Sequence, residues 1–150
     1  MIHMDKDLCI PLYITAKTFR NEHSKHLKKL GLTFTQFIVM MVLWDKDELM
    51  VKEIGSRLDL DSGTLTPVLK KLEDKGYVVR RQSEEDARDV MIRLTEEGRK
   101  LQTRVEQSRE KLFEERIMDA GKSERIRFLL TELITDLKDI MNDGGAADEK

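Results

Sequence analysis

The chain has 150 residues, of which 39% are hydrophobic, 37% charged and 5% aromatic, as is typical of one soluble domain with its assembly elements. The net charge of −2 gives no overall attraction to nucleic acid. No stretch approaches about 18 consecutive apolar residues, and the first residues lack the pattern of a secretion signal. The single cysteine excludes an intrachain disulfide. We therefore expect a cytoplasmic protein that does not enter a membrane.

The N-terminal part of the chain carries an amphipathic helix pattern. Apolar residues recur near helical spacing from Leu8 to Leu30. Pro11 is compatible with this helix only in its first turn, where its missing N–H has no intrahelical partner. The helix should therefore begin close to Cys9, and Gly31 should end it.

A second helix is predicted directly after the first. Thr33 and Gln36 have the spacing of a capping box, and the helix that they open, Phe34 to Trp44, is apolar nearly all round. Such a helix belongs in the centre of the core. A short helix from Val51 to Leu58 comes next, and a turn over 59–61 connects it to a further helix.

The helix that follows this turn has a divided surface. Its inward positions are the leucines Leu65, Leu69 and Leu72. Its outward positions form a small polar surface suited to the major groove of DNA: Ser62, Thr64, Thr66, Lys70 and Lys71. Lys75 and Gly76 end the helix, by the preference for glycine just past a helix C-terminus.

Pro67 lies well inside this helical pattern, where proline removes a backbone hydrogen bond and disfavours helical geometry at the preceding residue. Two interpretations are open. Either the helix begins later, near Pro67, or an irregular first turn presents small polar residues to base edges and phosphates. Those residues are Ser62, Gly63, Thr64 and Thr66. We favour the second interpretation, because positions that break a local rule tend to mark functional sites.

Two short strand patterns, 77–81 and 90–94, are joined through residues 83–88 as a charged hairpin. Thr95 then caps a long helix that extends to about Arg116, and a last helix spans Ser123 to Met141. Helix, turn, helix and hairpin in this order predict a winged helix-turn-helix, which is a module that binds duplex DNA.

The hairpin supplies further candidate DNA contacts. Arg80 and Arg81 alternate along a strand, so at most one of them faces DNA directly, and the other forms an ion pair or contacts phosphate. At the tip, Asp86 and Arg88 are two residues apart. An ion pair between them would aim the Arg88 guanidinium at a narrow, electronegative minor groove. The alternative is a solvated hairpin turn.

Long amphipathic helices lie at both ends of the chain, although the winged module does not need them for its own core. We therefore expect a mainly α protein with a small β-wing that assembles as a homodimer. The winged helix-turn-helix would span about 33–95, the dimerisation helices about 7–32 and 96–141, and a disordered tail 142–150.

Cys9 is the candidate for thiol chemistry, because it lies at a helix N-terminus, where the helix dipole favours a thiolate. The alternative is a small hydrophobic side chain on an apolar stripe. His3, His23 and His26 do not make a convincing metal set with one cysteine. The sequence also has no phosphate loop, nucleophile elbow or paired-carboxylate signature. We expect no metal, no cofactor and no enzymatic activity.

The chain resembles the MarR family of dimeric winged-helix repressors over almost its whole length, as a single MarR-like domain of residues 1–150. The matching motifs between Lys52 and Gly98 include Asp86-x-Arg88 in the wing and Leu94-Thr95-x-x-Gly98 after it. Further motifs are similar to the organic hydroperoxide-sensing (OhrR-like) subgroup: Leu8-Cys9 with Tyr13, Leu32-Thr33, Leu43-Trp44, and the run from Leu60 to Pro67.

This resemblance implies that Cys9 is a sensor, which organic hydroperoxides oxidise to a sulfenic acid so that the dimer leaves DNA. As the only cysteine, it would need a low-molecular-weight thiol or a backbone nitrogen to complete the reaction. The sensor pocket implied is Tyr13, His23 and Phe34. The last two stand where the subgroup has tyrosines that bond the cysteine across the dimer; Phe34 cannot form such a bond, whereas a protonated His23 could stabilise a thiolate by charge.

The sequence therefore predicts a homodimeric repressor with a thiol switch, bound to a pseudo-palindromic duplex whose half-sites lie about 10 base pairs apart, one duplex turn. Three alternatives stay open. A repressor released by a small aromatic or phenolic ligand would keep its response in Cys9→Ser. A thiol-dependent peroxidase would turn over peroxide repeatedly. A protein-interaction module would show no salt-dependent binding of duplex DNA.

Overall fold

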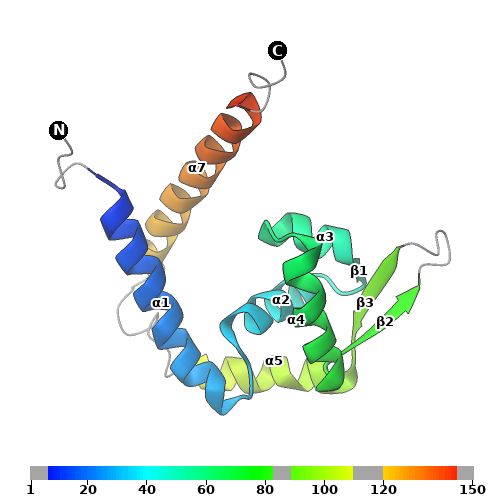
Figure 1. The fold of residues 1–150 in the computed structure, drawn as a ribbon. Coiled ribbons are helices and arrows are strands. Elements are labelled where there is room, and N and C mark those ends of the chain that lie inside the picture. Colours follow the sequence, from blue (N-terminus) through cyan, green and yellow to red (C-terminus); the bar gives the residue numbers. More distant parts are fainter. Residues whose placement is uncertain (1–6, 83–88, 110–119, 145–150) are drawn as a thin grey trace. The chain divides into compact units, whose positions relative to one another are not determined.

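The computed structural model describes residues 7–82, 89–109 and 120–144. By packing, the chain divides into two units, Met1–Leu112 and Phe113–Lys150, and each is described by itself. The first unit contains the helices α1 to α5 and the strands, and the second contains α7 (Figure 1). The assembly of all 150 residues into one domain stays a prediction.

The helices α1 (Cys9–Lys29) and α2 (Phe34–Asp45) lie where the sequence predicts them. Gly31 ends α1 with a left-handed φ of 70°. The predicted capping box at the start of α2 is confirmed. Thr33 Oγ1 accepts the Gln36 N–H at 3.2 Å, and Gln36 Oε1 accepts the Thr33 N–H at 3.1 Å.

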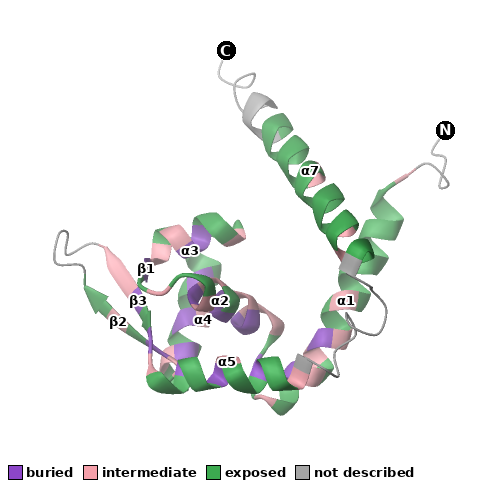
Figure 2. Cartoon of the chain, turned by 180° about the vertical axis from the view of Figure 1, so that it is seen from behind, coloured by how far each residue is buried: buried purple, intermediate pink, exposed green. Residues whose placement is uncertain are grey.

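The helix α2 forms the centre of the first unit, as its apolar composition predicts. Its buried apolar side chains are Phe37, Val39, Met40 and Leu43. Besides α1, three helices pack against it: α3 (Val51–Leu58), α4 (Ser62–Asp74) and α5 (Glu96–Arg109). Figure 2 shows buried residues gathered on α2 and on parts of these three helices, whereas α7 is exposed along most of its described length.

The helix α4 confirms the predicted division of its surface but not its predicted start. Leu65, Leu69 and Leu72 are fully buried, and the five outward polar residues are all exposed. The helix begins at Ser62 and continues through Pro67. Neither the later start nor the irregular first turn is therefore observed.

The first turn of α4 has features that offset the effect of Pro67. Proline removes the hydrogen bond to the carbonyl of Gly63, at a cost of about 3 kcal/mol or more inside a helix. Gly63 is exposed, so water can satisfy its carbonyl. Asp61 also caps the helix, since its Oδ1 accepts the Thr64 N–H at 2.7 Å.

The wing is a three-stranded antiparallel sheet in the order β1-β3-β2. The strands β2 (Val78–Gln82) and β3 (Val90–Leu94) pair as the predicted hairpin, with β2 displaced by one residue from the predicted 77–81. The strand β1 (Leu49–Met50), which the sequence analysis did not predict, pairs with β3. Residues 83–88, and with them the predicted ion pair of Asp86 and Arg88, lie outside the described residues.

The start of α5 is joined closely to the rest of the first unit. Thr95 caps α5 as predicted, because its Oγ1 accepts the Gly98 N–H at 3.0 Å. The carbonyl of Gly98 accepts a hydrogen bond from Trp44 Nε1, also at 3.0 Å. A side chain at position 98 would not fit, because a Cβ there would lie 2.1 Å from the carbonyl oxygen of Tyr77. This joint therefore connects α2, α5 and the base of the wing.

In the second unit, α7 spans Ala120–Gly144 and is longer at both ends than the predicted helix. Residues 142–144, which the sequence analysis assigned to the tail, are helical; residues 145–150 and the predicted end of α5 near Arg116 lie outside the described residues. No single helix among the described residues has the length and apolar character of a membrane span, although α1 and α2, bent by 80° at their junction, pass that test as a pair.

Candidate nucleic-acid interface and thiol site

The helices α3 and α4 and the strands of the wing border a hollow of about 540 Å³. Ser62 and Thr66 line it from α4, Lys52 from α3, and Arg80 from β2. Lys70 and Lys71 are exposed further along α4. Hydroxyls, lysines and an arginine on a protruding helix and strand are the groups that contact phosphates and base edges of DNA.

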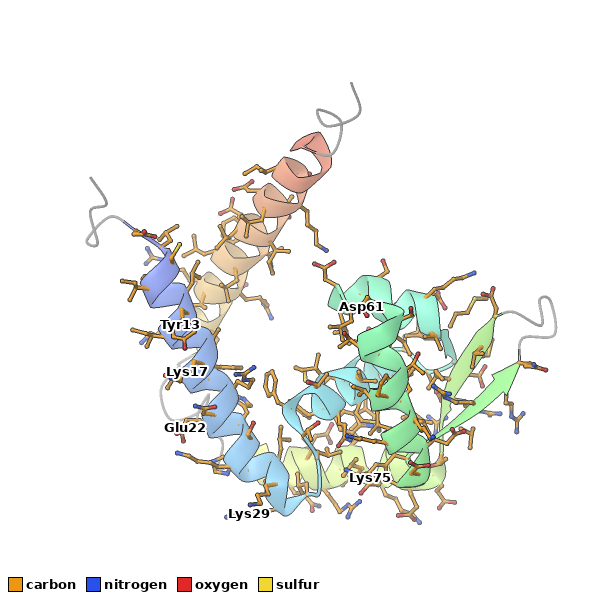
Figure 3. All side chains as sticks on the ribbon, viewed as in Figure 1. Tyr13, Lys17, Glu22, Lys29, Asp61 and Lys75 are labelled. Atoms are coloured by element: carbon orange, nitrogen blue, oxygen red, sulfur yellow. The ribbon has the colours of Figure 1, made fainter. Side chains whose placement is uncertain are left out.

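Asp61 holds the start of this surface in place, at the first turn of α4 (Figure 3). Its carboxylate accepts the N–H of Thr64 at 2.7 Å and the Thr64 hydroxyl at 3.0 Å. These two hydrogen bonds hold the pKa of Asp61 below its usual value, since they favour the charged form. The first turn of α4, which carries Ser62 and Thr64, is therefore held by hydrogen bonds within the chain.

The two wing arginines differ, as their alternation on the strand predicts. Arg80 turns toward α4, where its Nη2 donates to the Thr66 carbonyl at 3.5 Å and its Nε lies 3.8 Å from a Glu73 carboxylate oxygen. Arg81 is exposed. Arg80 thus connects the wing to α4 and lines the hollow beside it, whereas Arg81 lines a separate hollow with Arg93 and Arg99. The DNA contacts of both residues stay predictions.

An ion pair that the sequence analysis missed supports the wing from α3. Lys52 Nζ lies 2.8 Å from Asp89 Oδ2. Lys52 is in the first turn of α3, and Asp89 directly precedes β3. The two residues are 37 positions apart, so no local pattern could reveal the pair.

Cys9 is the first residue of α1 and is exposed. Asp7 Oδ1 accepts the Cys9 N–H at 2.8 Å. A hydrogen bond between the thiol and the Asp7 carboxylate, together with the negative charge of that carboxylate, raises the pKa of Cys9. The Cys9 N–H, and after it the thiol, lowers the pKa of Asp7. The expectation that the helix N-terminus favours the thiolate is therefore wrong for this chain, because a specific nearby carboxylate outweighs the helix dipole.

Two of the three predicted sensor-pocket residues come together. His23 is buried, its Nδ1 lies 2.9 Å from the Phe19 carbonyl oxygen, and its ring centroid lies 4.1 Å from that of Phe19. The Phe34 ring is 5.9 Å from that of His23 in an edge-to-face arrangement. Tyr13 is exposed nearer the start of α1, with Lys17 Nζ 5.7 Å from the centre of its ring, and it lines the same hollow as Phe34 (Figure 3).

Within one chain, Cys9 does not reach this aromatic cluster. Cys9 and His23 lie on the same helix, and their separation along its axis is about 21 Å at 1.5 Å per residue. A hollow of about 540 Å³ beside the cluster is lined by Tyr13, Arg20 and Phe34, among others. In the described part of the chain, no group of three or more His, Cys, Asp or Glu side chains is placed to hold a metal ion.

A polar helix and a β-wing on a helix-turn-helix core define a winged-helix DNA-binding protein. The model of the family described as transcriptional regulator SarA/Rot matches residues 22–105, and the chain belongs to this family. It is 42% identical over 113 residues to the HTH-type transcriptional regulator SarZ of Staphylococcus epidermidis, which covers 75% of this chain and 76% of SarZ.

Three solved structures extend the comparison. Reduced AbfR bound to DNA is 32% identical, with a TM-score of 0.79 over 89% of this chain and 92% of that one. Disulfide-formed AbfR is also 32% identical, with a TM-score of 0.64 over 90% of each chain. A MarR transcriptional regulator from Methanosarcina mazei is 25% identical, with a TM-score of 0.73 over 85% and 94%.

These matches confirm the predicted MarR-like winged-helix fold, and the chain is a DNA-binding transcriptional regulator. The predicted place in the hydroperoxide-sensing subgroup stays a prediction.

Proposed function

We propose that this regulator is a cytoplasmic homodimeric repressor that leaves its operator when Cys9 is oxidised by an organic hydroperoxide or a related oxidant. The observation that carries the proposal is the exposure of the only cysteine of the chain on an apolar stretch of α1. The relative AbfR supports redox chemistry at a cysteine in such a protein, because AbfR is solved reduced on DNA and also with a disulfide.

The exposed apolar side chains favour a dimer. On α1 they include Leu8, Tyr13 and Ile14, and on α7 Phe128 and Ile134. A second copy would cover such surfaces. It would also explain the separation of Cys9 from the His23 and Phe34 cluster, if Cys9 meets that cluster on the partner subunit. A monomer in light scattering at micromolar concentration would contradict the dimer.

In the proposed chemistry the Cys9 thiol first loses its proton to water, a step that the nearby Asp7 carboxylate opposes. The thiolate sulfur then attacks the terminal peroxide oxygen. The S–O bond forms, the O–O bond breaks, and the alkoxide leaves with a proton as an alcohol. Sulfur is thereby oxidised by two electrons and the peroxide is reduced. A small thiol then displaces water from the sulfenic acid and leaves a mixed disulfide; a backbone nitrogen would instead give a sulfenamide.

The reduced dimer would place two α4 helices in successive major grooves about 10 base pairs apart. We assign the base-edge and phosphate contacts to Ser62, Gly63, Thr64, Thr66, Lys70 and Lys71 on α4, and to Arg80, Arg81 and Arg88 on the wing, with Asp86 orienting Arg88. Oxidation need only favour a conformation that cannot span both half-sites. A coupling free energy of about 1–3 kcal/mol suffices for a 5- to 150-fold loss of affinity.

The test is the affinity of purified, reduced protein for the DNA upstream of its own gene, before and after cumene hydroperoxide. We expect wild type to be released by the oxidant and Cys9→Ser to stay bound. Addition of a thiol reductant should restore binding of the oxidised wild type. Release of Cys9→Ser by the oxidant would overturn the proposal.

A second candidate is a repressor released by a small aromatic or phenolic ligand. The observation that favours it is the hollow between α1 and α2, whose lining includes the rings of Tyr13 and Phe34 and the cations of Lys17 and Arg20. Rings and cations together suit an aromatic molecule with a negative group. In that case neither wild type nor Cys9→Ser would respond to peroxide, and both would respond to the ligand. The peroxidase and the protein-interaction module gain no support, because the relatives are transcriptional regulators.

A further inference from the structure

We propose that Lys75 is a positioning residue that fixes the orientation of α4 relative to α1, and that it thereby determines which half-site spacing the dimer accepts. The inference rests on the proposed homodimer. Lys75 ends α4, and its Nζ donates to the Gly31 carbonyl, directly after α1, and to Gln36 Oε1 at 2.8 Å, in the first turn of α2. One side chain thus connects three helices.

The groups that Lys75 contacts are themselves held in place. Gln36 is buried, and its Oε1 also accepts the Thr33 N–H of the capping box, so the amide cannot turn away without opening α2. The Gly31 carbonyl lies at the C-terminus of α1, where the helix dipole is negative and favours an ammonium group. Figure 3 shows Lys75 at the end of α4 and Lys29 at the end of α1.

These contacts bear on spacing because of what each helix does in the proposed dimer. The exposed N-terminal half of α1 would pack against the partner, whereas α4 would enter the major groove. The distance between the two α4 helices then depends on how rigidly each is held to its own α1. Inserting one base pair between the half-sites shifts one of them by about 3.4 Å and rotates it by about 35°. We expect a dimer without Lys75 to follow that shift more readily than a dimer with Lys75 in place.

The experiment uses the full-length reduced protein. Its preferred duplex is selected from a random pool and resynthesised with one base pair inserted or deleted midway between the half-sites. The readout is the ratio of the Kd for each altered duplex to the Kd for the parent duplex. Lys75→Met removes the ammonium group. Lys29→Met is the matched control, since it removes a lysine from the last turn of α1, and Lys75→Arg restores a cationic donor. Thermal unfolding verifies that each variant is folded.

For wild type, Lys29→Met and Lys75→Arg, we expect the Kd for each altered duplex to exceed the Kd for the parent duplex on the order of tenfold or more. A factor of this size is within the usual range of coupling between two sites. Lys75→Met should lose most of this discrimination while it keeps an ordinary thermal transition. Loss of affinity for all three duplexes by the same factor would assign Lys75 to DNA contact or stability and overturn the inference. Unchanged ratios in Lys75→Met would also overturn it. If wild type itself showed no spacing preference, the proposed dimer on paired half-sites would fail instead.

Discussion

The winged part of the first unit buries most of its apolar side chains, whereas the helices near the two chain ends leave many of theirs exposed. Leu65, Leu69 and Leu72 of α4 are fully buried, whereas Tyr13 on α1 is 65% exposed and Phe128 on α7 is 60% exposed. The winged part therefore completes its own core. The outer half of α1 leaves apolar surface uncovered, and so does an exposed stripe of α7 that contains Leu130, Ile134 and Leu137. A second copy would bury such surface. Folding and assembly should consequently respond to different substitutions.

The largest expected effect is a loss of stability when the buried core of the winged part is truncated. Leu69→Ala should lower the free energy of unfolding by about 2–5 kcal/mol, because it leaves a cavity where the leucine was fully buried. The effect should not depend on protein concentration. Leu137→Ala on α7, where the leucine is exposed, should lower the unfolding temperature only in a concentration-dependent way. Urea and thermal unfolding at two protein concentrations measure both. If both variants lost the same stability at both protein concentrations, Leu69 and Leu137 would not differ in their roles in folding and assembly.

The role of α7 in assembly can be tested by placing a charged side chain in its exposed apolar stripe. Ile134→Asp should weaken the dimer at least about tenfold, or about 1.4 kcal/mol, because a carboxylate would have to be desolvated in an apolar contact. Glu132→Lys, on the same helix but outside the stripe, is the control and should leave the dimer intact. Sedimentation equilibrium over a range of concentrations gives the dissociation constants. A dimer of unchanged stability in Ile134→Asp would exclude α7 from the interface.

The smallest effect concerns the pH dependence of Cys9. Because Asp7 raises the pKa of the thiol, the thiolate forms at higher pH than in an ordinary cysteine, and alkylation by iodoacetamide should rise through that raised pKa. Asp7→Asn removes the charge but keeps an oxygen for the Cys9 N–H, so the curve should move to lower pH and the rate at neutral pH should increase. Asp59→Asn serves as the control. Superimposable curves for Asp7→Asn and wild type would show that Asp7 does not control the thiol.

Local signals explain most of what the sequence could predict of the fold. The capping box of Thr33 and Gln36, the stop at Gly76 and the inward leucines of α4 each depend on residues within a few positions of one another. The three-dimensional contacts could not be predicted in this way. The strand β1 is only two residues long and exists because it pairs with β3, far along the chain. Lys52 with Asp89, and Lys75 with Gln36, are separated by 37 and 39 positions.

Two wrong expectations have a different origin, since general rules were applied without their local context. Pro67 was expected to disturb α4, but the cap at Asp61 and the exposure of Gly63 offset its cost. The helix dipole was expected to favour the Cys9 thiolate, but Asp7, two positions earlier in the sequence, acts in the opposite direction. Asp61 and Asp7 are each an aspartate close to the start of a helix, which is a common capping pattern that can be recognised in the sequence.

The joint at which Trp44 bonds the Gly98 carbonyl has a spectroscopic consequence. The chain contains one tryptophan, so the intrinsic fluorescence of the unlabelled protein arises at the meeting point of α2 and α5. Indole emission is sensitive to hydrogen bonding and to contact with water. Any movement of α5 relative to the winged core, on DNA binding or on oxidation, would therefore be recorded by a natural probe, without a dye or an added cysteine.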